Sequence, residues 1–145
     1  MSQLQQATLD RLVSFYQSLD ARPLSELAEI YHPEICLRDP VGQHQGLPQL
    51  EHYFAGLMKN LRYCRFDVTL ARQFDDDALL LWRMNFAHPA LQRGAAQQLE
   101  GSSYLQFTDD KIHFQQDYYD LGAMLYDKLP LLGAVTGLIK RRLRP

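Results

Sequence analysis

Four long stretches of alternating apolar and polar residues follow one another between residues 63 and 119, and they limit the folds open to this chain. Such alternation is typical of strands that bury one face. Acidic turns separate the first two stretches and the last two. Strands joined in this way form an antiparallel meander, and strands this long require a strongly bent sheet. The predicted strands are Tyr63–Phe74, Ala78–Ala87, Leu99–Thr108 and Lys111–Tyr119.

Helices are predicted before and after this meander in the sequence. Apolar residues recur with helical spacing in three N-terminal segments and in the tail, which Pro130 interrupts. One short strand lies between the second and third helices. The predicted helices are Leu4–Leu19, Leu24–Tyr31, Leu47–Asn60 and Gly122–Pro145, and the short strand is Glu34–Asp39.

This order of elements indicates an α+β fold in which helices pack on the concave face of a curved sheet, mixed or antiparallel. A pocket between the two layers is then the expected ligand site. At 145 residues the chain is long enough for one domain with its own core. We expect the core to span about residues 4–121 and residues 122–145 to form a helical extension.

The composition argues against several classes of function. A net charge of −2 gives no general attraction to nucleic acid or to an anionic membrane. The first residues are polar and uncharged, no segment is long and apolar enough to span a membrane, and two cysteines are too few for a disulfide framework. The five histidines lack metal-ligand spacing, and no phosphate-binding glycine loop is present. We therefore expect a cytoplasmic protein with no metal or other cofactor, no nucleic-acid partner and no membrane contact.

Asp39 is the acid whose position is most informative. It shares a strand parity with Ile35 and Leu37, so its carboxylate is expected on an apolar face. Two interpretations stay open. The carboxylate either caps the turn at Pro40–Gly42 or faces the pocket, where a carboxylate in apolar surroundings suits proton transfer.

Arg83 and Asp117 each have two orientations open to them. Both faces of the strand around Arg83 are apolar, so the guanidinium points either into the pocket, paired with Asp117 or Asp39, or to the outer side of the sheet. Simple alternation from Ile112 turns Asp117 outward, but a β-bulge would reverse its direction.

Three local motifs make the chain resemble a known superfamily. They are EIYHPEICLRDPVG at 29–42, QG at 45–46 and QQDYYDL at 115–121. With the element order, they resemble the SnoaL-like proteins of the nuclear-transport-factor-2-like superfamily. The resemblance implies a cone-shaped, cystatin-like roll around an apolar pocket, a small hydrophobic ligand, and a homodimer packed through the outer face of the sheet.

Ketosteroid isomerases are one enzyme branch of this superfamily. Their Asp-Pro-x-Gly turn, which carries the general base, is similar to the turn that Asp39 opens, and Tyr16 stands near the position of their oxyanion donor. Ser103 replaces their second donor, an acid, and Phe54 replaces a further tyrosine. The resemblance therefore implies Asp39 as base and Tyr16 as donor.

Limonene epoxide hydrolases are a second branch, with an Asp-Arg-Asp arrangement. Arg83 and Asp117 resemble the arginine and one acid, whereas Asn85 replaces the other acid and Leu37 replaces a tyrosine. Both branches place the parity of Asp117 and Tyr119 in the pocket.

Two functions are consistent with these residues. One is binding of a small hydrophobic molecule with cofactor-free acid–base chemistry, such as isomerisation, cyclisation, dehydration or epoxide opening. The other is a non-catalytic ligand-binding or protein-interaction domain of the same fold. The expected catalytic residues are Asp39, Tyr16, Arg83 and Asp117. The expected pocket residues are Tyr31, Phe54, Trp82, Asn85, Ser103 and Tyr119.

Overall fold

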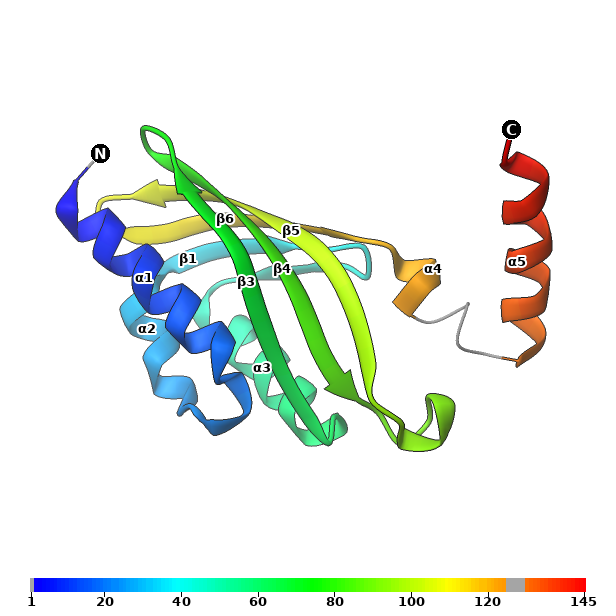
Figure 1. Ribbon diagram of the computed structural model, residues 1–145. Coiled ribbons are helices and arrows are strands. Elements are labelled where there is room, and N and C mark those ends of the chain that lie inside the picture. Colours follow the sequence, from blue (N-terminus) through cyan, green and yellow to red (C-terminus); the bar gives the residue numbers. More distant parts are fainter. Residues whose placement is uncertain (1, 125–129) are drawn as a thin grey trace.

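A six-stranded mixed sheet bends around three N-terminal helices in the computed structural model, which describes residues 2–124 and 130–145 (Figure 1). The strand order is β2-β1-β6-β5-β4-β3. β1 pairs with β6 in parallel, and every other pairing is antiparallel. The strands are β1 (Tyr31–Arg38), β2 (Gln43–Gln45), β3 (Tyr63–Gln73), β4 (Asp77–Ala87), β5 (Gln97–Thr108) and β6 (Lys111–Tyr119).

The three N-terminal helices cover the concave face of the sheet and bury their apolar stripes against it (Figure 1). Ser2 caps the first helix by accepting a hydrogen bond from the amide of Gln5, and Gly46 begins the third with a φ of 86° that suits glycine. The helices are α1 (Gln3–Gln17), α2 (Leu27–Ile30), α3 (Leu47–Asn60), α4 (Leu121–Met124) and α5 (Pro130–Leu143), with 3-10 turns η1 (Leu19–Ala21), η2 (Leu24–Glu26) and η3 (Gln92–Gly94).

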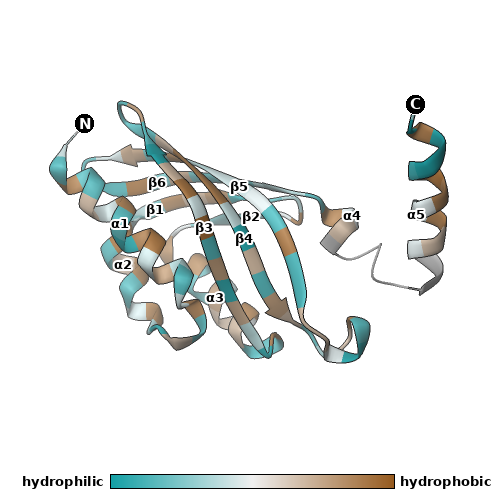
Figure 2. Cartoon of the chain, in the orientation of Figure 1, coloured by the Kyte–Doolittle hydropathy of each residue, from teal (hydrophilic) through white to brown (hydrophobic). Residues whose placement is uncertain are grey.

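The core lies between these helices and the sheet. Hydrophobic and hydrophilic residues alternate along the strands, as expected for a sheet with one buried face (Figure 2). The most deeply buried side chains come from both layers, and they include Leu9, Leu12, Phe15, Leu27, Ile35, Leu50, Leu80 and Leu105.

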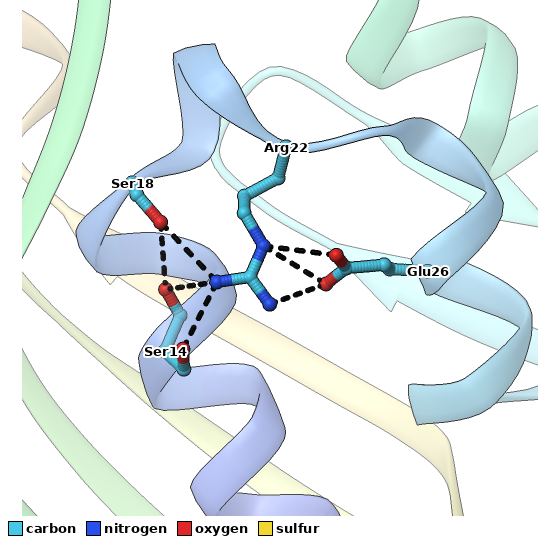
Figure 3. Close-up of polar contacts among 4 residues, drawn as sticks. All are labelled: Ser14, Ser18, Arg22 and Glu26. Atoms are coloured by element: carbon cyan, nitrogen blue, oxygen red, sulfur yellow. Dashed lines mark hydrogen bonds and ion pairs between the residues drawn. The ribbon is translucent and has the colours of Figure 1, made fainter.

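Arg22 ties the end of α1 to the turn that follows it (Figure 3). Its guanidinium donates to the Glu26 carboxylate, with a shortest distance of 2.6 Å, and to the hydroxyls of Ser14 at 3.0 Å and Ser18 at 3.3 Å. The fork of donors on one arginine thereby holds the chain in the sharp bend before β1.

An irregularity in β6 decides which residues face the cavity. Phe107 of β5 pairs with Ile112, but the preceding Gln106 pairs with Phe114, so His113 is an extra residue in β6. This β-bulge reverses the alternation of the strand. Ile112 and Gln115 are both fully buried, although simple alternation places them on opposite faces.

The predicted fold class is confirmed, and several element bounds are corrected. The second predicted helix is only the short η2 and α2, because Tyr31 already begins β1. β2 was not predicted. In the tail, residues 125–129 lie outside the described residues, whereas α5 is helical and lies apart from the sheet (Figure 1). No helix among the described residues has the length and apolar character needed to cross a membrane.

Candidate functional site

A cavity of about 230 Å³, here called the deep cavity, lies between the helices and the concave face of the sheet. Its wall is mainly aromatic and aliphatic, and Asp117 is the one acidic residue among the described residues that line it. The lining residues are Tyr16, Leu37, Val41, Tyr53, Phe54, Leu57, Phe66, Trp82, Met84, Leu99, Asp117 and Tyr119.

Asp117 enters this wall because the β-bulge turns it inward. Its Oδ1 accepts hydrogen bonds from the hydroxyl of Ser103 at 2.6 Å and from the side-chain amide of Gln115 at 2.9 Å. The Ser103 oxygen in turn accepts from the indole N–H of Trp82 at 2.9 Å. None of the described residues donates to Oδ2, so that oxygen is free to meet a ligand.

Burial raises the pKa of Asp117 to about 6. The hydrogen bonds from Ser103 and Gln115 oppose this rise because they favour the charged form, and the nearby charge of Asp39 adds to it. A carboxyl group with this pKa is mostly ionised at neutral pH but takes up a proton readily, which is the property a general base needs.

Two buried tyrosines meet Gln115 behind Asp117. Tyr31 donates to Oε1 of Gln115 at 2.7 Å, and the Gln115 amide donates to the Tyr16 oxygen at 2.8 Å. The two tyrosine oxygens are 3.4 Å apart. Burial raises the pKa of Tyr16 well above its ordinary value, so the hydroxyl keeps its proton. Because the one hydroxyl proton of Tyr31 goes to Gln115, Tyr16 is the donor in this 3.4 Å contact, and a ligand oxygen that takes its proton replaces Tyr31 as the acceptor.

Asp39 caps its turn. Its Oδ1 accepts from the backbone amides of Val41 at 2.8 Å and Gly42 at 2.9 Å. Its Oδ2 accepts from the Tyr53 hydroxyl at 3.4 Å. Burial raises the pKa of Tyr53, and the Asp39 charge raises it further. The structure thus favours the capping interpretation, and Asp39 contacts the deep cavity through Tyr53.

Arg83 and Asn85 lie on the outer face of the sheet, so the expectation that they face the pocket is wrong. The Arg83 side chain is 44% exposed and forms an ion pair with Glu100 at 3.1 Å. Asn85 donates to Asp67 at 3.0 Å. Their neighbours Trp82, Met84 and Phe86 are buried.

The other predicted residues lie in or behind the cavity wall. Tyr16, Phe54, Trp82 and Tyr119 line it, whereas Tyr31 and Ser103 stand behind it and act through Gln115 and Asp117. Sequence reasoning did not single out Tyr53 or Gln115. For Gln115 the available signal was its strand parity, which is the same as that of Asp117.

A wider chamber of about 780 Å³, here called the outer chamber, adjoins the deep cavity. The two share Tyr53, Leu57 and Met84 as lining residues. The outer chamber is lined by His44, Pro48, Gln49, His52, Tyr53, Gly56, Leu57, Asn60, Leu61, Met84, Phe86, His88 and Leu91.

Neither a metal site nor a reactive thiol is visible in the part of the chain that the structure describes. No group of three histidine, cysteine or acidic side chains is arranged to hold a metal ion there. Burial raises the pKa of the Cys64 thiol to about 12, which keeps it protonated and unreactive.

Comparison with known proteins points to one family. The model of the SnoaL-like domain matches residues 12–114. No curated protein matches the chain. A protein from Jannaschia sp. CCS1 that bears the name of a SnoaL-like polyketide cyclase superposes with a TM-score of 0.74 at 12% identity, over 88% of this chain and 95% of its own.

Two further crystal structures have the same fold. A Catenulispora acidiphila protein with a ketosteroid isomerase-like fold, in complex with trimethylamine, has a TM-score of 0.72 at 14% identity, over 82% of this chain and 92% of its own. A nuclear-transport-factor-2-like protein of unknown function from Burkholderia pseudomallei has a TM-score of 0.74 at 13% identity, over 86% and 96%. At these identities the similarity establishes the fold alone.

Proposed function

This chain belongs to the SnoaL-like domain family, and from that premise we propose that it binds a small hydrophobic molecule in the deep cavity and moves protons on it with Asp117, without a cofactor. The observation that carries the proposal is the state of the Asp117 carboxylate. One oxygen is held by Ser103 and Gln115, whereas the other accepts no hydrogen bond from any described residue, and the side chain lines an apolar cavity.

The arrangement suits proton transfer at a carbon next to a carbonyl group. Ionised Asp117 removes the proton through Oδ2, and the Tyr16 hydroxyl donates a hydrogen bond to the oxygen on which negative charge develops. Asp117 then returns the proton to a second carbon of the same molecule, which completes an isomerisation, or the carbanion first attacks a carbonyl carbon of the same molecule and the proton goes to the new alkoxide oxygen, which completes a ring closure. No other reactant is consumed in either case.

The family comparison supports this class of reaction. One structural relative bears the name of a polyketide cyclase, and another has a ketosteroid isomerase-like fold. The proposed residues differ from the sequence-based expectation in two respects. Arg83 lies on the outer face and takes no part. Asp117 replaces Asp39 as the base, because the turn amides and Tyr53 already occupy the Asp39 oxygens.

A generic carbon acid tests the proposal without knowledge of the natural substrate. Elimination of 5-nitrobenzisoxazole needs only a base in an apolar site, and its phenolate product is coloured. We expect turnover by the wild type that rises with pH and levels off above about 6, since only the ionised form of Asp117 is active. Asp117→Asn should lower the rate at least about 100-fold.

Asp39→Asn is the matched control, because an amide oxygen can still accept from the turn amides. It should keep most of the activity. Equal loss in both variants would contradict the assignment of the base to Asp117. Binding of the probe without turnover in any form would support the alternative function, a ligand-binding domain that is not an enzyme.

A further inference from the structure

The deep cavity is too small to hold a typical ligand by itself. Ligand sites usually enclose roughly 300–1,000 Å³, whereas this cavity measures about 230 Å³. The outer chamber adds about 780 Å³ beyond Tyr53, Leu57 and Met84, which line both. A molecule that contacts Asp117 and fills the site therefore extends into the outer chamber.

The polar groups of the outer chamber differ in kind from those of the deep cavity. Its lining includes three imidazoles and two carboxamides but no carboxylate. The deep cavity instead has the Asp117 carboxylate in its wall. Negative charge thus lies at Asp117 and at Asp39, which Tyr53 contacts, and the described lining of the outer chamber adds none of its own. The polar lining residues of the outer chamber are His44, Gln49, His52, Asn60, His88 and Tyr53.

His88 is held as a donor toward the outer chamber. Its Nδ1 accepts a hydrogen bond from the backbone amide of Ala90 at 3.0 Å. A neutral imidazole that accepts at Nδ1 carries its proton on Nε2, so the other edge of the ring presents an N–H group. His44 lies on β2, four strands from β4 in the sheet order, and its ring packs on the ring of Tyr53, which contacts Asp39, with centroids 4.1 Å apart.

A guanidinium group adds positive charge beside this chamber. Arg62 packs against Gly94, on the loop that also carries His88 and Leu91. Gly94 has a φ of 78°, and a Cβ there would lie 2.6 Å from Cζ of Arg62. Among the described residues no carboxylate forms an ion pair with Arg62. The field at the outer end of the site therefore favours an anion.

We propose that the ligand is an elongated aromatic or alicyclic molecule that ends in an anionic group, such as a carboxylate, sulfonate or phenolate, which His88 binds in the outer chamber with Arg62 beside it. This inference rests on the proposed function, because it assumes that the same molecule occupies the deep cavity. It adds the chemical class of the ligand and its orientation, with the anionic end away from Asp117.

Two fluorescent probes with the same aromatic framework separate charge from shape. Anilinonaphthalene sulfonate carries an anionic group, and N-phenyl-1-naphthylamine lacks it. The dissociation constants of both are measured for the wild type, for His88→Gln and for His32→Gln, at about pH 7.5. His32 is the matched control, because its Nδ1 also accepts a backbone amide at 3.0 Å, but it lines neither chamber.

His88→Gln should bind the sulfonate about 10-fold more weakly, as expected for loss of a hydrogen bond to a charged group. Its affinity for the neutral probe should change less than about twofold, and His32→Gln should leave both affinities unchanged. An unchanged sulfonate affinity, or equal weakening for both probes, overturns the assignment of an anionic end. Failure of the folded wild type to bind either probe overturns the proposed function as well, and circular dichroism establishes that each variant is folded.

Discussion

The hydroxyl of Ser103 donates to Oδ1 of Asp117 at 2.6 Å, so a residue outside the cavity lining controls the acid inside it. Ser103→Ala removes a donor that favours the ionised carboxylate, and the pKa of Asp117 should rise further above its ordinary value. A hydrogen bond to a charged group contributes roughly 1.5–3 kcal/mol, so the midpoint of the pH–rate profile should move up by about one unit. Ser102→Ala, on the opposite face of the same strand, should leave the midpoint unchanged.

Asp117 should make the stability of the protein depend on pH. Its pKa in the folded chain is about 6, above the roughly 3.9 expected when unfolded. Between these values the folded state binds more protons, so the free energy of unfolding falls as pH rises from about 4 to about 6. Asp117→Asn does not titrate, and it should therefore be more stable than the wild type at about pH 7, by up to about 3 kcal/mol.

That gain should largely disappear by about pH 3, where the wild-type carboxyl group is mostly neutral in both states. Urea unfolding of both proteins at the two pH values measures the difference. A stability gain of the same size at both pH values would show that folding does not raise the pKa of Asp117.

Gly101 gives the indole of Trp82 its place in the cavity wall. A Cβ at this position would lie 2.4 Å from Cη2 of Trp82 and 2.8 Å from the carbonyl oxygen of Tyr118. Gly101→Ala should therefore push the ring toward the cavity and destabilise the protein by about 1–3 kcal/mol. Trp82 is the one tryptophan of the chain, so its emission spectrum reports the displacement directly. Trp82→Phe in the same chain should recover part of the lost stability, and full recovery would implicate the ring alone.

Gly56 offers a way to close the outer chamber without disturbing the core. It lies within α3 and lines the chamber, and a Cβ there would meet no atom within 4 Å. Gly56→Ala should stabilise the helix by up to about 1 kcal/mol and leave ligand binding intact. Gly56→Phe places an aromatic ring in the chamber and should abolish binding of anilinonaphthalene sulfonate. Undiminished binding to Gly56→Phe would locate the probe elsewhere.

On the outer face of the sheet, Leu81, Ser102 and Tyr118 form a row across β4, β5 and β6. Leu81 and Tyr118 are its apolar members. Both pair with Ser102 of β5, and they are 40% and 59% exposed. The homodimer implied by the resemblance should bury this row. Sedimentation is expected to give twice the 16.8 kDa mass of the chain, and Leu81→Glu should shift it to the monomer. Phe74 is an aromatic residue beyond the end of β3 that is exposed to a similar extent, and Phe74→Glu should leave the dimer intact. A monomeric wild type would refute the dimer.

The sequence predicted elements best where local and long-range signals agree. The bounds of α3 and β6 match the prediction, because glycine and proline mark the start of α3 and an acidic turn marks the start of β6. β2 was missed because Gln43–Gln45 is short and wholly polar, so only its pairing with β1 makes it a strand. The predicted helix that ends at Tyr31 is shorter because sheet pairing begins there.

The candidate site was less accessible to sequence reasoning, for physical reasons. Leu79 and Leu81 lie on the same outward face of β4 as Arg83. Apolar residues on both faces therefore did not distinguish the buried face of this strand from the outer one. The direction of Asp117 depends on the β-bulge at His113, which leaves no mark in composition. Only the resemblance to known enzymes placed Asp117 correctly.

The extra residue at His113 divides β6 into two segments of opposite phase. Before it, Ile112 serves the stability of the core, and after it, Gln115 and Asp117 serve the chemistry of the cavity. Deleting His113 would bring the strand back into a single phase and expose the acid on the outer surface, with the core residue still in place. One inserted residue therefore lets the same strand change its chemistry without repacking the core.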